Sequence, residues 1–467
     1  MASSAGAAPT LNSPLVPPMP IRTVLVVLAL APVLLAAQAA SSGAADNRID
    51  VVTPMAPELA AFGTYAVGAR TLTVTDQNRP DVLRTKQGEP TARYARSLVL
   101  EVWYPAARAG AGSRSTGGEY RVIMRDPAVT VTLRGQARRD APPLQGGRPV
   151  PLVILSHGYP GNRFLMSHLG ENLASKGYVV VSIDHTESTY DDAQAFASTL
   201  YNRSLDQLFV LRELARLGTH ASGSFLAGLV DASRTGLIGY SMGGYGVVNV
   251  IGGGYRAAAA SLPGAPPNQL LLERSAGNSA YTASMDPRIM AAVAIGPWGM
   301  PAGVWDAAGL SGIRTPTLFV AGSVDEVSGY DTGTRAIFRA AVNTDRYLLT
   351  FLNAGHNAGA PIPAPAESHA FSEALKSFPF THYADPVWDT QRMNNILAHF
   401  VTAHFDLQLK GDSTRRAYLT VVPAGKDGVY AIDRTGTPQA THTYWKGFKR
   451  GTAVGLVLEH ERAAPPQ

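Results

Sequence analysis

Continuous apolar runs alternate along the middle of the chain with segments whose apolar residues recur at helical spacing. An apolar run of this kind is typical of a strand buried on both faces of a sheet. Strands that alternate with helices predict an α/β fold with a mostly parallel central sheet and helices on both faces. The expected strands are residues 151–156, 178–184, 235–241, 290–296, 317–323 and 347–352.

The expected helices occupy segments between and after these strands. Residues 203–217 carry leucines at near-helical spacing, and residues 390–409 carry one apolar stripe that we interpret as core packing. Residues 166–176 predict a further helix that ends at Gly177. Two strand-like stretches come before the alternating region, at residues 64–75 and 96–105.

The remaining segments suggest how the chain is divided. We expect residues 40–60 to be a linker, residues 61–410 to be one large α/β domain, and residues 411–467 to be a C-terminal extension. The extension contains short strand-like pieces, so it either extends the sheet or covers it. Two excursions interrupt the large domain, at residues 106–148 and 357–389.

The first excursion differs in composition from the segments around it. It is rich in Gly, Arg and Pro, which are typical of surface loops. Its one strand-like piece is expected at residues 120–124. We therefore interpret residues 106–148 as a long excursion over the surface.

The N-terminus carries the pattern of an export signal. Residues 23–37 are almost wholly apolar, Arg22 stands before them, and Ala37 and Ala39 fit the two positions that a signal peptidase reads. The run is shorter than the ~20 residues of a membrane-spanning helix, and an uncleaved anchor is the alternative. We expect residues 1–39 to be a signal peptide, and the mature protein to be periplasmic or extracellular without a stable membrane span.

Composition and charge narrow the possible functions. The 467 residues are 45% hydrophobic and 16% charged, which is typical of a globular protein. The net charge is +5, but the basic residues are scattered, and the densest cluster is only Arg134, Arg138 and Arg139. We therefore expect no nucleic-acid partner. The absence of cysteine excludes disulfides, thiol catalysis and cysteine metal sites.

The strongest chemical signal is Gly-Tyr-Ser-Met-Gly at residues 239–243. It follows a buried strand and precedes an expected helix, which is the context of the G-x-S-x-G elbow of the α/β-hydrolase fold. The flanking glycines leave room for a strained turn that exposes the Ser241 hydroxyl. We therefore predict that Ser241 is a nucleophile on a protein of this fold.

A serine nucleophile needs a base and an acid, which follow it in that fold in the order serine, acid, histidine. Asp325 comes after the fifth expected strand and His356 after the sixth. We predict that His356 is the general base and that Asp325 orients it. The alternatives are Glu326 as the acid and His382 as the base, whereas Asp184 is expected to be structural.

The oxyanion of the reaction requires two backbone N–H donors that are already in position. One is expected from Met242, directly after the nucleophile. The other is expected from Tyr159, in the loop that follows the first buried strand, where Gly158 allows the chain to turn.

With these residues in place, the chain resembles the branch of the α/β hydrolases that holds platelet-activating-factor acetylhydrolases, dienelactone-hydrolase-like proteins and cutinase-like polyester hydrolases. The resemblance covers residues 60–410. Its most specific stretches are VILSHGYPGNR, LASKGYVVVSIDHTES, LIGYSMGG, AVAIGPWG and TLFVAGSVDE.

The position of the acid separates the members of this branch. The acetylhydrolases place it after the strand that follows the nucleophile helix, where this chain has no carboxylate. The polyester hydrolases place it one strand later, as at Asp325, and carry similar residues at the positions of Tyr159, Met242 and Trp298. The resemblance implies that these three side chains line the substrate cleft, although each can also be ordinary core. The two excursions and the C-terminal extension depart from compact polyester hydrolases and can cover that cleft.

These residues favour a serine esterase that hydrolyses carboxylic esters, with a short-chain acyl, lipid-like or polyester-like substrate, through an acyl-enzyme. The alternatives are an amidase or peptidase on the same triad, or a non-catalytic binding protein of hydrolase fold. We expect no cofactor and no metal, since His399 and His404 are five residues apart and fall off one helix face. The expected partner is a small-molecule, lipid or polymer ester.

Overall fold

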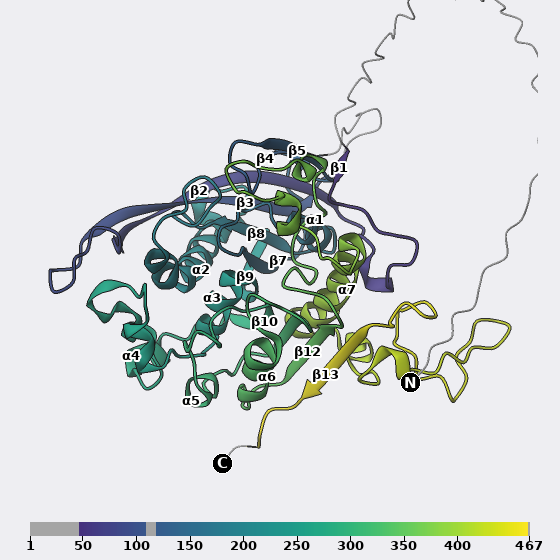
Figure 1. Cartoon of the computed structure of the whole chain (residues 1–467). Helices are drawn as coiled ribbons and strands as arrows, with labels where there is room; N and C mark the ends of the chain where they lie inside the picture. Colours follow the sequence, from purple (N-terminus) through teal and green to yellow (C-terminus); the bar gives the residue numbers. More distant parts are fainter. Residues whose placement is uncertain (1–45, 109–117, 466–467) are drawn as a thin grey trace, which may run out of the picture. The chain divides into compact units, whose positions relative to one another are not determined.

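The computed structural model describes residues 46–108 and 118–465. These residues fold around a mixed sheet of ten strands, in the order β13-β12-β11-β10-β9-β7-β8-β3-β2-β6 (Figure 1). Its six central strands are parallel and coincide with the six apolar runs, so the predicted parallel sheet is confirmed. They are β7 (Val150–Ser156), β8 (Val179–Asp184), β9 (Val230–Tyr240), β10 (Ile289–Ile295), β11 (Thr317–Gly322) and β12 (Arg346–Phe351).

Antiparallel strands complete both sides of this parallel core. On one side, β3 (Arg93–Ala106) pairs with β8, and β2 (Ala66–Pro80) pairs with β3. The short strand β6 (Arg138–Arg139) pairs with β2. On the other side, β13 (Leu456–Glu461) pairs with β12.

Helices cover both faces of the sheet, as predicted. Side chains of β7 alternate between the two layers: Val153 and Leu155 pack in the core cluster that contains α1 and α7, whereas Leu152 and Ile154 pack in the cluster that contains α2, α3 and α6. The period of two along a strand produces this division. The helices are α1 (Ser167–Ser175), α2 (Phe196–Gly218), α3 (Met242–Val250), α4 (Ser279–Ala283), α5 (Ala307–Leu310), α6 (Arg335–Ala340), α7 (Thr390–Leu409) and α8 (Arg416–Leu419).

The first excursion contains more structure than its composition suggests. Strands β4 (Glu119–Ile123) and β5 (Thr130–Arg134) form an antiparallel hairpin. The sequence predicted the first of these strands only. The second alternates buried Val131 and Leu133 with polar residues, but only over five positions, which is too short to stand out in a Gly-, Arg- and Pro-rich segment.

The described end of the expected linker is packed against the large domain. Strand β1 (Asn47–Arg48) adds to β5, and Ile49 is buried beside it. A short 3-10 helix, Glu58–Ala60, follows, and the N–H of Leu59 donates to His399 Nδ1 on α7 at 3.1 Å. The predicted signal peptide, residues 1–39, and the first residues of the expected linker lie outside the described residues. In the part that is described, no helix is both long and apolar enough to cross a membrane.

The C-terminal extension both extends the sheet and covers a helix. Strand β13 lies antiparallel to β12, with Leu458 opposite Leu349 (Figure 1). Before it, Trp445 and Phe448 pack their rings against Phe400 of α7 at centroid distances of 5.8 Å. Both roles that the sequence left open for this segment are therefore found.

Candidate active site

Ser241 lies in the turn between β9 and α3. Its backbone has φ 53° and ψ −114°, a sparsely populated conformation for a residue with a side chain, which costs on the order of 1–3 kcal/mol. The flanking glycines make the turn possible. A Cβ on Gly239 would lie 2.2 Å from the carbonyl oxygen of Gly243, and a Cβ on Gly243 would lie 1.9 Å from that of Ser156.

Asp325 and His356 come from the loops after β11 and β12 and lie side by side. His356 Nδ1 is 3.0 Å from each carboxylate oxygen of Asp325. Burial alone would raise the pKa of Asp325, but the hydrogen bond and charge of His356, with the N–H groups of Ser328 and Val327, hold the pKa below its usual value. The carboxyl is therefore ionised at neutral pH and orients the imidazole.

Ser241 and His356 line the same cavity, whose volume is about 340 Å³. This size suits a small organic ligand. Gly158 and Tyr159, from the loop after β7, form part of the wall. A Cβ on Gly158 would lie 3.3 Å from the Ser241 Cβ, so this loop approaches the serine closely.

The two expected oxyanion donors flank Ser241. Met242 is the first residue of α3, and the first N–H groups of a helix have no intrahelical acceptor. Tyr159 lines the cavity, and in the described chain its N–H is not hydrogen-bonded to another residue. Both amides are therefore available to a ligand oxygen, and their role as donors remains a prediction.

Comparisons with known proteins find similarity to cutinases and to polyester hydrolases. Residues 140–270 match the model of a family described as PET hydrolase-like. The chain is 27% identical over 205 residues to cutinase est1 of Thermobifida alba, which covers 44% of this chain and 52% of that protein. It is 26% identical over 205 residues to bis(hydroxyethyl) terephthalate hydrolase of Streptomyces coelicolor, covering 44% and 49%. The chain resembles the cutinase-like branch of the α/β hydrolases.

The predicted fold is also confirmed by a solved structure. A ferulic acid esterase from Streptomyces cinnamoneus matches with a TM-score of 0.51 and 22% identity, over 79% of this chain and 94% of that one. A likeness at this identity shows the α/β-hydrolase fold alone. The matched region spans only about half the length of the curated relatives.

Both excursions contribute walls to the cavity. Arg125 comes from the first, and several residues come from the second. The matched family segment, residues 140–270, includes neither Arg125 nor any residue of 357–389. The excursions therefore determine a part of the cavity that the residues around Ser241, Asp325 and His356 do not. The residues from the second excursion are Asn357, Leu375, Ser377, Phe378, Pro379, Thr381 and His382.

Two of the three side chains that the resemblance assigns to the cleft are set back from the cavity. Met242 is buried, and neither it nor Trp298 is among the lining residues. The Trp298 ring packs on Phe196 at 5.3 Å, and Phe196 packs on Tyr159 at 5.2 Å. Trp298 therefore supports the wall at Tyr159 from behind, and its contact with substrate remains a prediction.

The alternative acid and base also have defined positions. Glu326 is exposed and lines the cavity, but only Asp325 is hydrogen-bonded to His356. His382 lines the cavity as well, and its Nε2 is 2.8 Å from Tyr190 Oη. Asp184 forms an ion pair with Arg163, as expected for a structural residue.

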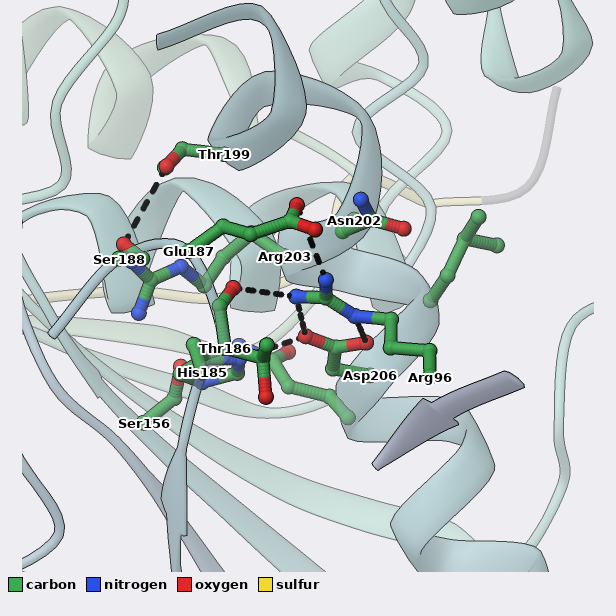
Figure 2. A network of polar contacts seen from close by, with 12 residues as sticks. Arg96, Ser156, His185, Thr186, Glu187, Ser188, Thr199, Asn202, Arg203 and Asp206 are labelled. Atoms are coloured by element: carbon green, nitrogen blue, oxygen red, sulfur yellow. Dashed lines mark hydrogen bonds and ion pairs between the residues drawn. The ribbon is translucent and has the colours of Figure 1, made fainter. Parts of the chain in front are cut away.

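A second group of polar residues, which the sequence did not single out, lies buried behind the loop after β7 (Figure 2). His185 Nδ1 is 3.0 Å from Asp206 Oδ2, and its Nε2 is 2.8 Å from Ser156 Oγ. Arg203 donates to the carbonyl oxygen of His157 at 2.7 Å. We refer to Ser156, His185 and Asp206 as the buried set, and to Ser241, Asp325 and His356 as the cavity set.

The buried set could not be found from a motif. Its members come from β7, from the end of β8 and from α2, and the sequence around Arg203 and Asp206 resembles an ordinary amphipathic helix. Among the described residues, no group of three or more His, Cys, Asp or Glu side chains could hold a metal ion.

Proposed function

We propose that this protein is a serine hydrolase that cleaves carboxylic esters through an acyl-enzyme. The observation that carries the proposal is that His356, which pairs with Asp325 at 3.0 Å, lines the same cavity as Ser241, which sits on a strained elbow. The similarity to cutinases and to a terephthalate ester hydrolase supports an ester as the substrate.

In this mechanism His356 Nε2 takes the proton of the Ser241 hydroxyl as Oγ attacks the ester carbonyl. The negative charge of the tetrahedral intermediate is bound by the N–H groups of Met242 and Tyr159. His356 then gives the proton to the departing alcohol, and an acyl-Ser241 ester remains. Water, activated by His356, attacks this ester and releases the acid. Asp325 stabilises the imidazolium in both steps.

We propose that the substrate is either a small ester or an extended ester of which only a part enters the cavity. The candidate classes are esters with a short acyl group, lipids and polyester chains. We further propose that the predicted signal peptide exports the enzyme.

The proposal is tested by the hydrolysis of p-nitrophenyl acetate, butyrate and palmitate by the mature protein and by Ser241→Ala. The variant is expected to lose ~10⁴–10⁶-fold in turnover. Ser233→Ala, an exposed serine on the same strand as the elbow, is the matched control. Faster cleavage of an amide than of its matched ester would favour an amidase. Absence of both turnover and fluorophosphonate labelling of Ser241 would overturn the proposal in favour of a binding protein.

A further inference from the structure

Arg125 lies two residues after the end of β4 in the first excursion and lines the cavity that contains Ser241. Its backbone N–H donates to Tyr383 Oη at 2.9 Å, which fixes this end of the hairpin to the second excursion. Because this hydrogen bond joins the two excursions, the position of Arg125 in the cavity wall is fixed by contacts of the folded protein. Arg125 is not on a free loop end.

The Arg125 side chain has no acceptor of its own. In residues 46–108 and 118–465 its guanidinium makes no hydrogen bond and no ion pair. The adjacent carboxylate, Asp126, is buried and accepts from the N–H of Ala128 and the hydroxyl of Ser372 instead. By contrast, Arg163 is paired with a carboxylate. The Arg125 side chain is partly exposed, and the N–H donors of its guanidinium are therefore available to a ligand in the cavity.

Among the described residues that line the cavity, no group neutralises the Arg125 charge by direct contact. Burial, together with the charge of Arg125, lowers the pKa of His382 to about 3, so His382 is neutral. Burial raises the pKa of Tyr159, and Arg125 opposes this rise. The guanidinium charge therefore affects the pKa values of His382 and Tyr159, which lie on two sides of the cavity wall. In the described chain, Glu326 is the one acidic residue that lines the cavity, and the paired Asp325 lies behind it. Glu326 is exposed and forms no ion pair with Arg125.

We propose that Arg125 binds a carboxylate of the substrate, so that the enzyme selects esters that carry a second, free acid group, such as half-esters of dicarboxylic acids. The planar guanidinium fork matches a carboxylate and binds it through two parallel hydrogen bonds. Because Arg125 and Ser241 line one cavity of about 340 Å³, one short molecule can place its carboxylate at the first and its ester carbonyl at the second. This inference rests on the proposed ester hydrolysis and adds the substrate class.

The test compares p-nitrophenyl hydrogen adipate with p-nitrophenyl hexanoate, which have acyl chains of equal length and differ in the terminal carboxylate. Arg125→Gln is expected to lower kcat/KM for the adipate ester roughly 10- to 100-fold, mainly through KM, as for the loss of a charge-assisted hydrogen bond. The hexanoate ester should change by less than about twofold. Arg125→Lys keeps the charge but lacks the planar guanidinium fork. Its kcat/KM for the adipate ester should therefore lie between the values of the wild type and Arg125→Gln. Arg121→Gln, an exposed arginine on β4, is the matched control and should alter neither substrate.

A binding measurement keeps this inference separate from the proposed function. Calorimetry with monomethyl adipate is made on Ser241→Ala and on the double variant Ser241→Ala, Arg125→Gln. Binding by the first and its loss in the second supports the anion site even if neither ester is hydrolysed. Equal loss of both esters in Arg125→Gln, no change in either ester, or equal binding by the two Ser241→Ala proteins would overturn the inference.

Discussion

The buried set and the cavity set contain the same three residue types, and their histidine–aspartate distances are the same, 3.0 Å. The buried set even includes the contact that a catalytic serine needs, since His185 Nε2 lies 2.8 Å from Ser156 Oγ. It nevertheless has no access to a ligand, because Ser156 and His185 are each 1% exposed and Asp206 is fully buried. Hydrogen-bond geometry alone therefore does not distinguish the two sets, whereas access to the cavity does.

The two sets also differ in how the charge of the carboxylate is used. Burial alone would raise the pKa of Asp206, but the charges of Arg96 and Arg79 hold it well below its usual value. These arginines already neutralise the charge that would otherwise favour an imidazolium. Burial, followed by the charge of Arg203, lowers the pKa of His185 to about 3. His185 therefore has a low proton affinity and is a weak base at pH 7. Asp325, in contrast, is hydrogen-bonded among the described residues only to His356 and to backbone N–H groups.

The largest expected difference is between the two serines. Ser241→Ala should reduce ester turnover ~10⁴–10⁶-fold, because no other hydroxyl takes its place on the elbow. Ser156→Ala removes one buried hydrogen bond and should cost about 1 kcal/mol of stability, with turnover reduced less than about tenfold. Steady-state kinetics and urea unfolding of both variants measure these effects. Loss of turnover in a folded Ser156→Ala protein, equal to that in Ser241→Ala, would break the distinction between the sets.

The two aspartates should separate activity from stability. Asp325→Asn removes the charge behind His356 and should lower kcat by about 10⁴-fold in a folded protein. Asp206→Asn leaves Arg79 and Arg96 buried without a full counter-charge and should cost about 3–5 kcal/mol of unfolding free energy. Thermal melts and kcat of the two purified proteins provide the readouts. A stable, inactive Asp206→Asn protein would contradict the structural role of the buried set.

Arg203 links the buried residues to the cavity and should have an intermediate effect. It donates to the carbonyl oxygen of His157, two residues before the predicted oxyanion donor Tyr159. Arg203→Lys keeps a charge but loses the fork, so the loop should be less firmly positioned and kcat should fall about tenfold with little change in KM. Arg212→Lys, exposed on the same helix, is the control. A change in KM alone would indicate a binding role instead.

What the sequence could predict depends on whether the information lies in one contiguous segment. The parallel strands are uninterrupted apolar runs, and the elbow at Ser241 is a five-residue motif, so both were recognisable. Asp325 and His356 were predicted because they follow successive strands in the order serine, acid, histidine of this fold, and their catalytic roles remain a prediction. The cavity set is therefore encoded by local pattern together with strand order.

The buried set and Arg125 lack such a local pattern. Helix α2 begins at Phe196, before the predicted start at residue 203. Its first turns were not predicted because they bury polar side chains, such as Ser198 and Asn202, and so show no apolar stripe. Arg125 reaches the cavity only because the β4–β5 hairpin folds onto the second excursion. These positions are set by tertiary contacts between distant segments, which periodicity does not report.

The last comparison concerns the protonation of the buried set, whose effect over a single pH unit is small. Because the pKa of His185 is about 3 in the folded protein and about 6.5 in an unfolded chain, the unfolded state binds more protons between these values. The contribution of neutral His185 to the unfolding free energy is therefore complete above about pH 6.5 and is lost progressively as the pH falls toward 3. The unfolding free energy should fall over this window, with His185 contributing at most ~1.4 kcal/mol per pH unit.

His185→Gln provides the matched test, because an amide can still donate toward Asp206 and accept from Ser156 but does not titrate. Urea unfolding at several pH values from 7 to 4 should give a shallower dependence on pH for this variant than for the wild type. Arg212→Lys should leave the dependence unchanged. An identical slope in His185→Gln and the wild type would mean that His185 takes up its proton in the folded protein as well. In that case the buried and cavity histidines would differ in access alone, and not in the charge state that the surrounding arginines impose.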